Sequence, residues 1–380
     1  MLKNHLLKYL LTLSLLLAGC GSDNSGNTQE TEIKEFVPVS EMYDGYEQLQ
    51  GKDFGNFKLP ESIEKPEFEK LYRFPDRRDG ADVPDEEART KELLKRTFGE
   101  EPEESLISAY ENWDGSKTYT LTLPEGRSAA LLHGFPISII KSAEELITPQ
   151  QELIHEYTPE DGGGIVELKK SSCSVSELLD NMQKRLESEV MQGLEGFELV
   201  PRSISNFRNS NNVSYAQIEY EVYYRGIKLE YDSPMSVLQS KSEYQVMTSY
   251  SINSVSLTAA DKEDYAIFSS TFSEQYPLTE EVTEAISLER AVQILQSELA
   301  QYSFYDFDSV ELCYCCKITA PVITNTDKDE DSRILANYGE IETAYFEPTW
   351  CFNYTGNPNG QQRREAVKVN AVTGEITIDK

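Results

Sequence analysis

Residues 287–302 read SLERAVQILQSELAQY and predict an amphipathic helix that decides the class of the C-terminal fold. Ser287 is a suitable N-cap, and Glu289 lies in the first turn, where a negative charge interacts favourably with the helix dipole. The apolar side chains recur at the spacing of one helix face, and they are Leu288, Ala291, Val292, Leu295 and Leu299. We therefore expect this helix to bury one face against a sheet.

The residues that follow this helix alternate between apolar and polar side chains. The alternation is clearest in residues 310–318, and residues 346–354 and 367–378 repeat it. Side chains on a strand point to opposite faces in turn, so this pattern is typical of strands with one buried face. The sequence therefore predicts antiparallel strands after the helix.

An earlier part of the chain repeats the order of a helix followed by strands. Residues 176–191 have helical periodicity, and Ser176 is the expected N-cap. Alternating segments rich in Tyr, Val, Ile and Ser follow at residues 197–204, 213–224, 227–238 and 244–257. We therefore predict an α+β fold with two tandem units, residues 171–275 and 276–380, each a helix packed on an antiparallel β-meander.

The chain before residue 171 is harder to assign. Residues 61–170 are charged and interrupted by prolines, and the segment from Pro84 to Glu87 predicts the start of one short helix. We expect a small mixed region there. Residues 20–60 are low in hydrophobicity, and a chain of this kind cannot bury enough apolar surface to offset its entropy. They predict a flexible tether.

The first twenty residues have the layout of an export signal. Lys3 and Lys8 precede an apolar stretch, which is about half the roughly 20 residues that a spanning helix needs. The stretch ends in Leu17-Ala18-Gly19-Cys20, which resembles the lipobox of bacterial lipoproteins. This resemblance implies cleavage of residues 1–19, lipidation of the Cys20 thiol, and attachment to the outer face of the cell membrane by acyl chains.

Composition excludes some classes of partner. The chain has 35 Lys and Arg against 66 Asp and Glu, which gives a formal net charge of −31. Nucleic-acid binding depends on clustered Lys and Arg, so we expect no nucleic-acid partner. The hydrophobic content of 39% is sufficient for folded cores, so disorder along the whole chain is excluded.

The C-terminal unit resembles the PepSY-like and YycH/YycI-like regulatory domains found outside the membrane in Gram-positive bacteria. The residues that carry the resemblance are the helix start at 288–291, the strand 308–312, the stretch Pro348-Thr349-Trp350-Cys351-Phe352, and the ending at 369–376. Residues 223–229 resemble the corresponding hairpin of a preceding unit. The resemblance implies an extracytoplasmic binding or inhibitory domain without enzymatic activity.

Five cysteines remain besides Cys20, and an odd number outside the cytoplasm cannot pair completely within one chain. Cys313 and Cys315 would share one face of a strand, and Cys316 would point to the other face. Three thiols of one strand therefore do not converge on a metal ion, and no metal site is expected. A disulfide between Cys351 and either Cys313 or Cys315 is the preferred interpretation, with free thiols as the main alternative.

No catalytic motif is recognisable. Outside the signal, the histidines are His133 and His155, and neither belongs to a known nucleophile or metalloprotease motif. The acidic run at residues 327–331 lacks the glycine and the closing glutamate of a calcium loop. Residues 162–164, Gly-Gly-Gly, do not lead into a predicted helix as a phosphate loop does, so we interpret them as a flexible junction.

These observations favour a membrane-anchored, extracytoplasmic lipoprotein that acts as a non-enzymatic binding or regulatory module for an envelope protein. No cofactor is expected. A cell-envelope hydrolase with paired carboxylates is one alternative, since acidic residues are abundant. A solute-binding lipoprotein is another, and it would require two α/β lobes with parallel sheets.

Overall fold

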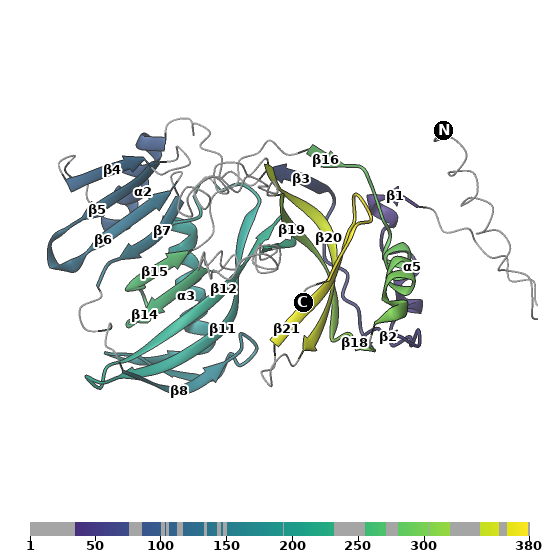
Figure 1. Cartoon of the computed structure of the whole chain (residues 1–380). Coiled ribbons are helices and arrows are strands. Elements are labelled where there is room, and N and C mark those ends of the chain that lie inside the picture. The colour runs from purple at the N-terminus through teal and green to yellow at the C-terminus, as the bar shows by residue number, and fades with distance from the viewer. Residues whose placement is uncertain are drawn as a thin grey trace, which may run out of the picture. The chain divides into compact units, whose positions relative to one another are not determined.

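The computed structural model describes residues 35–75, 86–99, 103, 106–111, 117–132, 135–142, 146, 150–192, 194–231, 255–270, 280–302, 304–319, 343–356 and 363–378. Strands predominate in this part of the chain (Figure 1). The α-helices are α2 (Glu86–Phe98), α3 (Val175–Glu189) and α5 (Leu288–Glu298). Short 3-10 turns cover Val39–Glu41, Tyr46–Gln48, Pro124–Gly126 and Leu299–Gln301. Among the residues described, no helix has the length and apolar character needed to cross a bilayer.

The strands of the N-terminal half are β1 (Val37–Pro38), β2 (Phe57–Lys58), β3 (Leu71–Pro75), β4 (Ile107–Glu111), β5 (Lys117–Thr122), β6 (Ser128–Leu132), β7 (Phe135–Ile140), β8 (Gln151–Tyr157), β9 (Ile165–Glu167) and β10 (Ser172–Ser174). Those that follow are β11 (Phe197–Asn209), β12 (Ser214–Tyr224), β13 (Ile227–Tyr231), β14 (Val255–Ala259), β15 (Ile267–Ser270), β16 (Glu280–Val282), β17 (Glu284–Ala285), β18 (Tyr305–Asp306), β19 (Ser309–Thr319), β20 (Thr343–Gly356), β21 (Arg363–Asn370) and β22 (Ile376–Ile378).

Most of these strands belong to one large mixed sheet. Its main path runs β16-β3-β20-β19-β13-β12-β14-β15-β7-β6-β5-β4, and β11, β8, β21 and β22 branch from it. Strands β13 and β19 pair in parallel, whereas their other neighbours in the sheet are antiparallel. The order of helix and then strands is found in both halves, as predicted. The prediction of two separate antiparallel meanders is wrong, because the β13–β19 pairing joins both halves in one sheet.

The N-terminal segment also differs from its prediction. The expected tether over residues 20–60 includes residues 35–60, which bury Met42, Phe57 and Leu59 in the main core. Strand β1 pairs with β17, and β2 pairs with β18. The backbone nitrogen of Leu288 donates to the carbonyl of Met42 at 2.9 Å. A few large apolar residues in a polar segment therefore suffice to dock it beside α5.

Residues 61–170 contribute strands to both halves. Strand β3 pairs with β20 and β16, in the C-terminal half. Strands β4 to β7 form an antiparallel meander that joins the sheet where β7 pairs with β15. Helix α2 begins at Glu86, within the segment that predicted it. The region expected to be small and separate is therefore part of the common sheet.

Side-chain caps define the starts of α3 and α5, the helices of the two tandem halves. The Ser287 hydroxyl accepts a hydrogen bond from the backbone of Arg290 at 3.2 Å, as predicted. Helix α3 is capped by Ser174 instead of Ser176, through the backbone of Glu177 at 3.1 Å. Ser174 and Glu177 have the spacing of a capping box, which favours the earlier start.

The glycine run at residues 162–164 is not a simple junction between elements. The backbone nitrogen of Val175 donates to the carbonyl of Gly164 at 2.9 Å, and that of Ser176 donates to the carbonyl of Gly162 at 3.1 Å. The first nitrogens of a helix have no partner within the helix. The glycine run therefore supplies acceptors at the start of α3, a role that the interpretation as a flexible junction missed.

Strands β19 to β21 have two faces of different chemistry. One face is apolar and packs against α5 and the N-terminal segment, and its members include Leu312, Tyr314, Trp350, Phe352, Val367 and Val369. Trp350 donates its indole N–H to the carbonyl of Ile286 at 2.9 Å, and its ring lies 5.0 Å from that of Tyr43. The other face carries thiols, carboxylates and lysines, and it is described below.

Candidate functional site

A pocket of about 760 Å³ lies where the tip of the β12–β13 hairpin meets the segment before β3. The residues that line it are Lys65, Pro66, Glu67, Phe68, Glu69, Lys70, Tyr72 and Arg225. This volume is within the range of roughly 300–1,000 Å³ that is common for small-molecule sites. The pocket is also open to solvent along one side, so a side chain or loop of another protein can enter it.

Arg225 is held in place by an aromatic pair and by an unusual backbone conformation. Its guanidinium lies 4.7 Å from the ring centre of Tyr72 and 5.6 Å from that of Tyr224, within the range of cation–π contacts. One guanidinium nitrogen donates to the Tyr72 hydroxyl at 2.5 Å. The backbone of Arg225 has a φ of 49°, which side chains other than glycine adopt infrequently. Its backbone nitrogen donates to the carbonyl of Gly196 at 2.7 Å.

Gly226 allows the hairpin to approach the opposite wall of the pocket. Its φ is +82°, and a Cβ added there would lie 2.3 Å from the carbonyl oxygen of Glu67. Two successive residues of positive φ define the type I′ turn that suits a two-residue hairpin. The turn therefore needs a glycine at this position, both for its conformation and for the close contact with Glu67.

The pocket brings together basic groups in a strongly acidic chain. Lys65, Lys70 and Arg225 line it together with Glu67 and Glu69. Lys70 donates to Glu281 at 2.7 Å, and this hydrogen bond raises the pKa of the lysine. A guanidinium has five N–H donors in a planar fork that matches a carboxylate. An acidic side chain is therefore the group that Arg225 is best placed to recognise.

The structure brings together three of the cysteines singled out from the sequence. Cys313 and Cys315 on β19 and Cys351 on β20 form one buried cluster. The sulfur atoms of Cys315 and Cys351 are 3.5 Å apart. These three residues, and Cys173 on β10, are present as thiols. The grouping on one face follows the prediction, and a disulfide from Cys351 to either neighbour stays a prediction.

Charged groups lie on the same face as these thiols. Lys228 on β13 donates to Glu221 at 2.8 Å and lies 3.4 Å from Glu230. Burial opposes the charge of Lys228, but the two carboxylates outweigh it and raise the pKa of the ammonium group. Burial also acts to raise the pKa of Glu221, but the hydrogen bond and charge of Lys228 lower it overall. Both groups are therefore held in their charged forms.

The lipidation site predicted at Cys20 and most of the positions that the sequence argued against as catalytic or calcium-binding lie outside the described residues. These positions are Cys20, His133 and the acidic run at residues 327–331. His155 is exposed on β8, and its ring centre lies 4.4 Å from that of Tyr157.

The buried carboxylates of the described part are Glu189 and Glu347, and both are held by cations. Lys141 donates to Glu189 at 2.7 Å, and Tyr265 donates to it at 2.8 Å. Arg73 pairs with Glu347 at 2.6 Å. These pairs tie α3 to β7 and β3 to β20, so both carboxylates have structural roles. Neither belongs to an open pair of carboxylates, which the alternative of a cell-envelope hydrolase would require.

Sequence reasoning placed Arg225 and Gly226 between two predicted strands, in a segment that resembles a hairpin, but it did not identify the pocket that they help to form. The opposite wall comes from residues 65–72, about 150 positions earlier in the chain. The mixture of Lys, Glu and Pro in that segment resembles an ordinary loop. The pattern of apolar and polar residues within one strand does not indicate that the β12–β13 turn contacts residues 65–72.

No protein-family model and no curated protein matches this chain. Among solved structures, the chain is similar to an uncharacterised protein from Eubacterium rectale. The match covers 86% of this chain and 92% of that one, with 11% sequence identity and a TM-score of 0.47. A similarity at this level assigns neither a family nor a function.

Proposed function

We propose that this protein is a lipid-anchored, extracytoplasmic binding or regulatory module that acts on another protein of the cell envelope. The lipobox-like ending at Cys20 supports the anchoring and the location. The resemblance of residues 287–378 to PepSY-like and YycH/YycI-like domains supports a regulatory role. The partner on the membrane side is the bilayer itself, reached through the acyl chains on Cys20.

The observation that carries this proposal is the pocket around Arg225. A positively charged group with two aromatic neighbours, in an open pocket at the tip of a hairpin, is typical of protein recognition sites, which are enriched in Arg and Tyr. Because Arg225 is positioned before any partner arrives, little side-chain entropy is lost on binding. We therefore infer that the partner inserts an acidic side chain into this pocket.

The experiment is a crosslinking pull-down of the lipidated protein from its native membrane. The wild type is compared with Cys20→Ser, which is unanchored, and with Arg225→Ala, which lacks the recognition group. Arg208→Ala is the matched control, since Arg208 forms an exposed ion pair with Glu167 on another part of the sheet.

The proposal predicts one envelope protein that is recovered with the wild type and with Arg208→Ala. Its recovery falls at least about tenfold with Arg225→Ala, which corresponds to about 1.4 kcal/mol of binding energy. Recovery that is equal for all the variants, or the absence of any specific partner, contradicts the proposal.

A further inference from the structure

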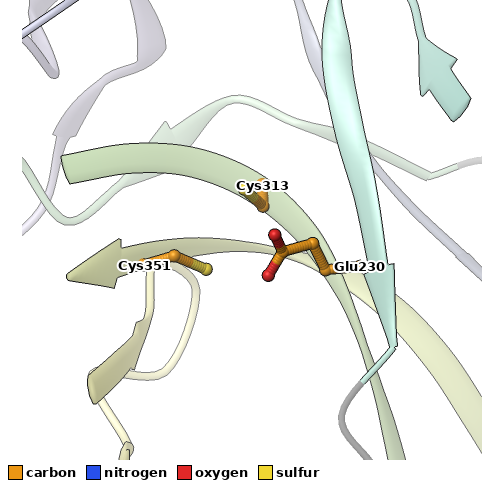
Figure 2. A group of neighbouring side chains, drawn as sticks. All are labelled: Glu230, Cys313 and Cys351. Carbon is orange, nitrogen blue, oxygen red and sulfur yellow. The ribbon is translucent and has the colours of Figure 1, made fainter. Parts of the chain in front are cut away.

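The thiol cluster lies on a part of the sheet that the proposed binding pocket does not use. Cys313 and Cys351 are completely buried, and Cys315 is 3% exposed. Strand β13 pairs with β19 in parallel and places Glu230 opposite Cys315. One ligand atom each from Glu230, Cys313 and Cys351 lies within 4.8 Å of the others. Figure 2 shows the Glu230 carboxylate directed toward Cys313 and Cys351.

We propose that Cys313, Cys315, Cys351 and Glu230 form a binding site for a thiophilic divalent cation of the Zn²⁺ class. Three sulfurs and one carboxylate are a suitable tetrahedral set, because Zn²⁺ binds both donor types. A tetrahedral ion with Zn–S bonds of about 2.3 Å holds sulfur pairs about 3.8 Å apart. The 3.5 Å separation of the Cys315 and Cys351 sulfurs is close to this value.

The four donor side chains come from three strands, β13, β19 and β20. The alternation along β19 alone therefore could not predict that they lie together. Alternation along β19 places Cys313 and Cys315 on one face, and these residues supply two of the thiols. The third thiol comes instead from β20 and the carboxylate from β13. Ligands on paired strands are held more precisely than ligands on loops. The sheet therefore holds Glu230, Cys313 and Cys351 close together before the ion arrives, and it places Cys315 beside Cys351.

Charge and access also fit a cation. Three thiolates, one carboxylate and a divalent ion together carry a net charge of −2. Lys228 lies 3.4 Å from Glu230, and the buried Lys368 is the register partner of Cys351 on β21, so two ammonium groups offset this charge. The Glu230 side chain is 23% exposed and offers a path for the ion from solvent.

Binding exchanges protons for the ion. The thiolate is the form that binds a metal ion, so each thiol that becomes a ligand releases its proton as the metal–sulfur bond forms. The exchange involves no change in oxidation state.

The test uses the full chain carrying Cys20→Ser, purified with reductant and freed of metal by a chelator. Titration with Co²⁺ reports tetrahedral thiolate ligation through charge-transfer absorption, and Zn²⁺ then displaces the cobalt. The ligand variants are Cys351→Ser and Glu230→Gln. Cys173→Ser is the matched control, because Cys173 is a buried free thiol outside the cluster. Near-ultraviolet circular dichroism verifies that each variant is folded.

We expect one cobalt ion per chain in the parent and in Cys173→Ser. The cobalt affinity falls about 100-fold or more in Cys351→Ser and in Glu230→Gln, at least as much as the loss of an outer-shell partner costs. Glu230→Gln is informative even if Cys351→Ser fails to fold, since Glu230 is partly exposed. The proposal is overturned if the reduced parent takes up no cobalt, or if the folded Glu230→Gln variant binds as tightly as the parent. Isolation of the native protein with a disulfide among the three thiols, together with no uptake after reduction, also overturns it.

Discussion

The two faces of strands β19 to β21 share one backbone but differ in almost every other respect. The apolar face is covered by α5 and by residues 35–60, and its largest member is Trp350. The opposite face also buries its side chains, yet it buries thiols, Thr349, Asn353 and Lys368. Burying polar groups costs free energy unless each is hydrogen-bonded or paired. One face therefore buries mainly apolar surface, whereas the other buries polar groups that must be paired or hydrogen-bonded.

The largest effect is expected from a truncation on the apolar face. Trp350→Ala removes a fully buried indole, its hydrogen bond to Ile286 and its contact with Tyr43. The free energy of unfolding should fall by about 3–5 kcal/mol, the usual cost of such a truncation. Chemical denaturation measures this value. Thr349→Val, one residue away on the polar face, is the control and should cost about 1 kcal/mol. Similar losses at both positions would remove the proposed difference between the faces.

A second, smaller effect is expected from Lys228 on the polar face. Lys228→Met leaves the carboxylates of Glu221 and Glu230 without their shared cation. We expect a loss of about 2–3 kcal/mol, somewhat below the usual cost of breaking a fully buried pair, because all three side chains retain some exposure. Lys262→Met is the control, since its pair with Glu177 is exposed and should contribute less than about 1 kcal/mol. A loss at Lys228 no larger than that of the control would contradict this prediction.

The same pair predicts a dependence of stability on pH. The pKa of Glu221 is lowered in the folded protein, because the hydrogen bond and charge of Lys228 outweigh burial. A carboxylate with a lowered pKa contributes stability above its unfolded pKa of about 4.3, and the contribution is lost as pH falls through the folded pKa. The difference in unfolding free energy between the wild type and Glu221→Gln should therefore shrink below about pH 4. A difference that is constant from pH 7 to pH 3 would show that the carboxylate charge contributes nothing.

Local features of this fold could be predicted from the sequence, whereas contacts between distant segments could not. The periodicity of residues 287–302 and the cap at Ser287 predicted α5 because both signals lie within a few residues. Alternation predicted which cysteines share a face. The β13–β19 pairing and the docking of residues 35–60 join segments roughly 80 to 250 positions apart. No local pattern encodes such a partner, so the Arg225 pocket and the role of Glu230 required the structure.

The smallest effect on the free energy of unfolding is expected at the serine caps of α3 and α5. Because each half of the chain has one of these caps, the two substitutions allow the halves to be compared. Ser287→Ala removes the acceptor for the backbone of Arg290, and Ser174→Ala removes the acceptor for Glu177. Each should reduce the unfolding free energy by about 1 kcal/mol, the usual contribution of a serine cap. Because one sheet joins the halves, both losses should shift the same cooperative transition. Two separate transitions in denaturation, each moved by only one variant, would instead show that the halves unfold independently, as the tandem-unit prediction implies. Ser176→Ala tests the cap predicted from the sequence: the backbone of Glu177 donates to Ser174, and the Ser176 hydroxyl is hydrogen-bonded to that of Ser174 at 3.1 Å, so its loss should be smaller than that of Ser174→Ala.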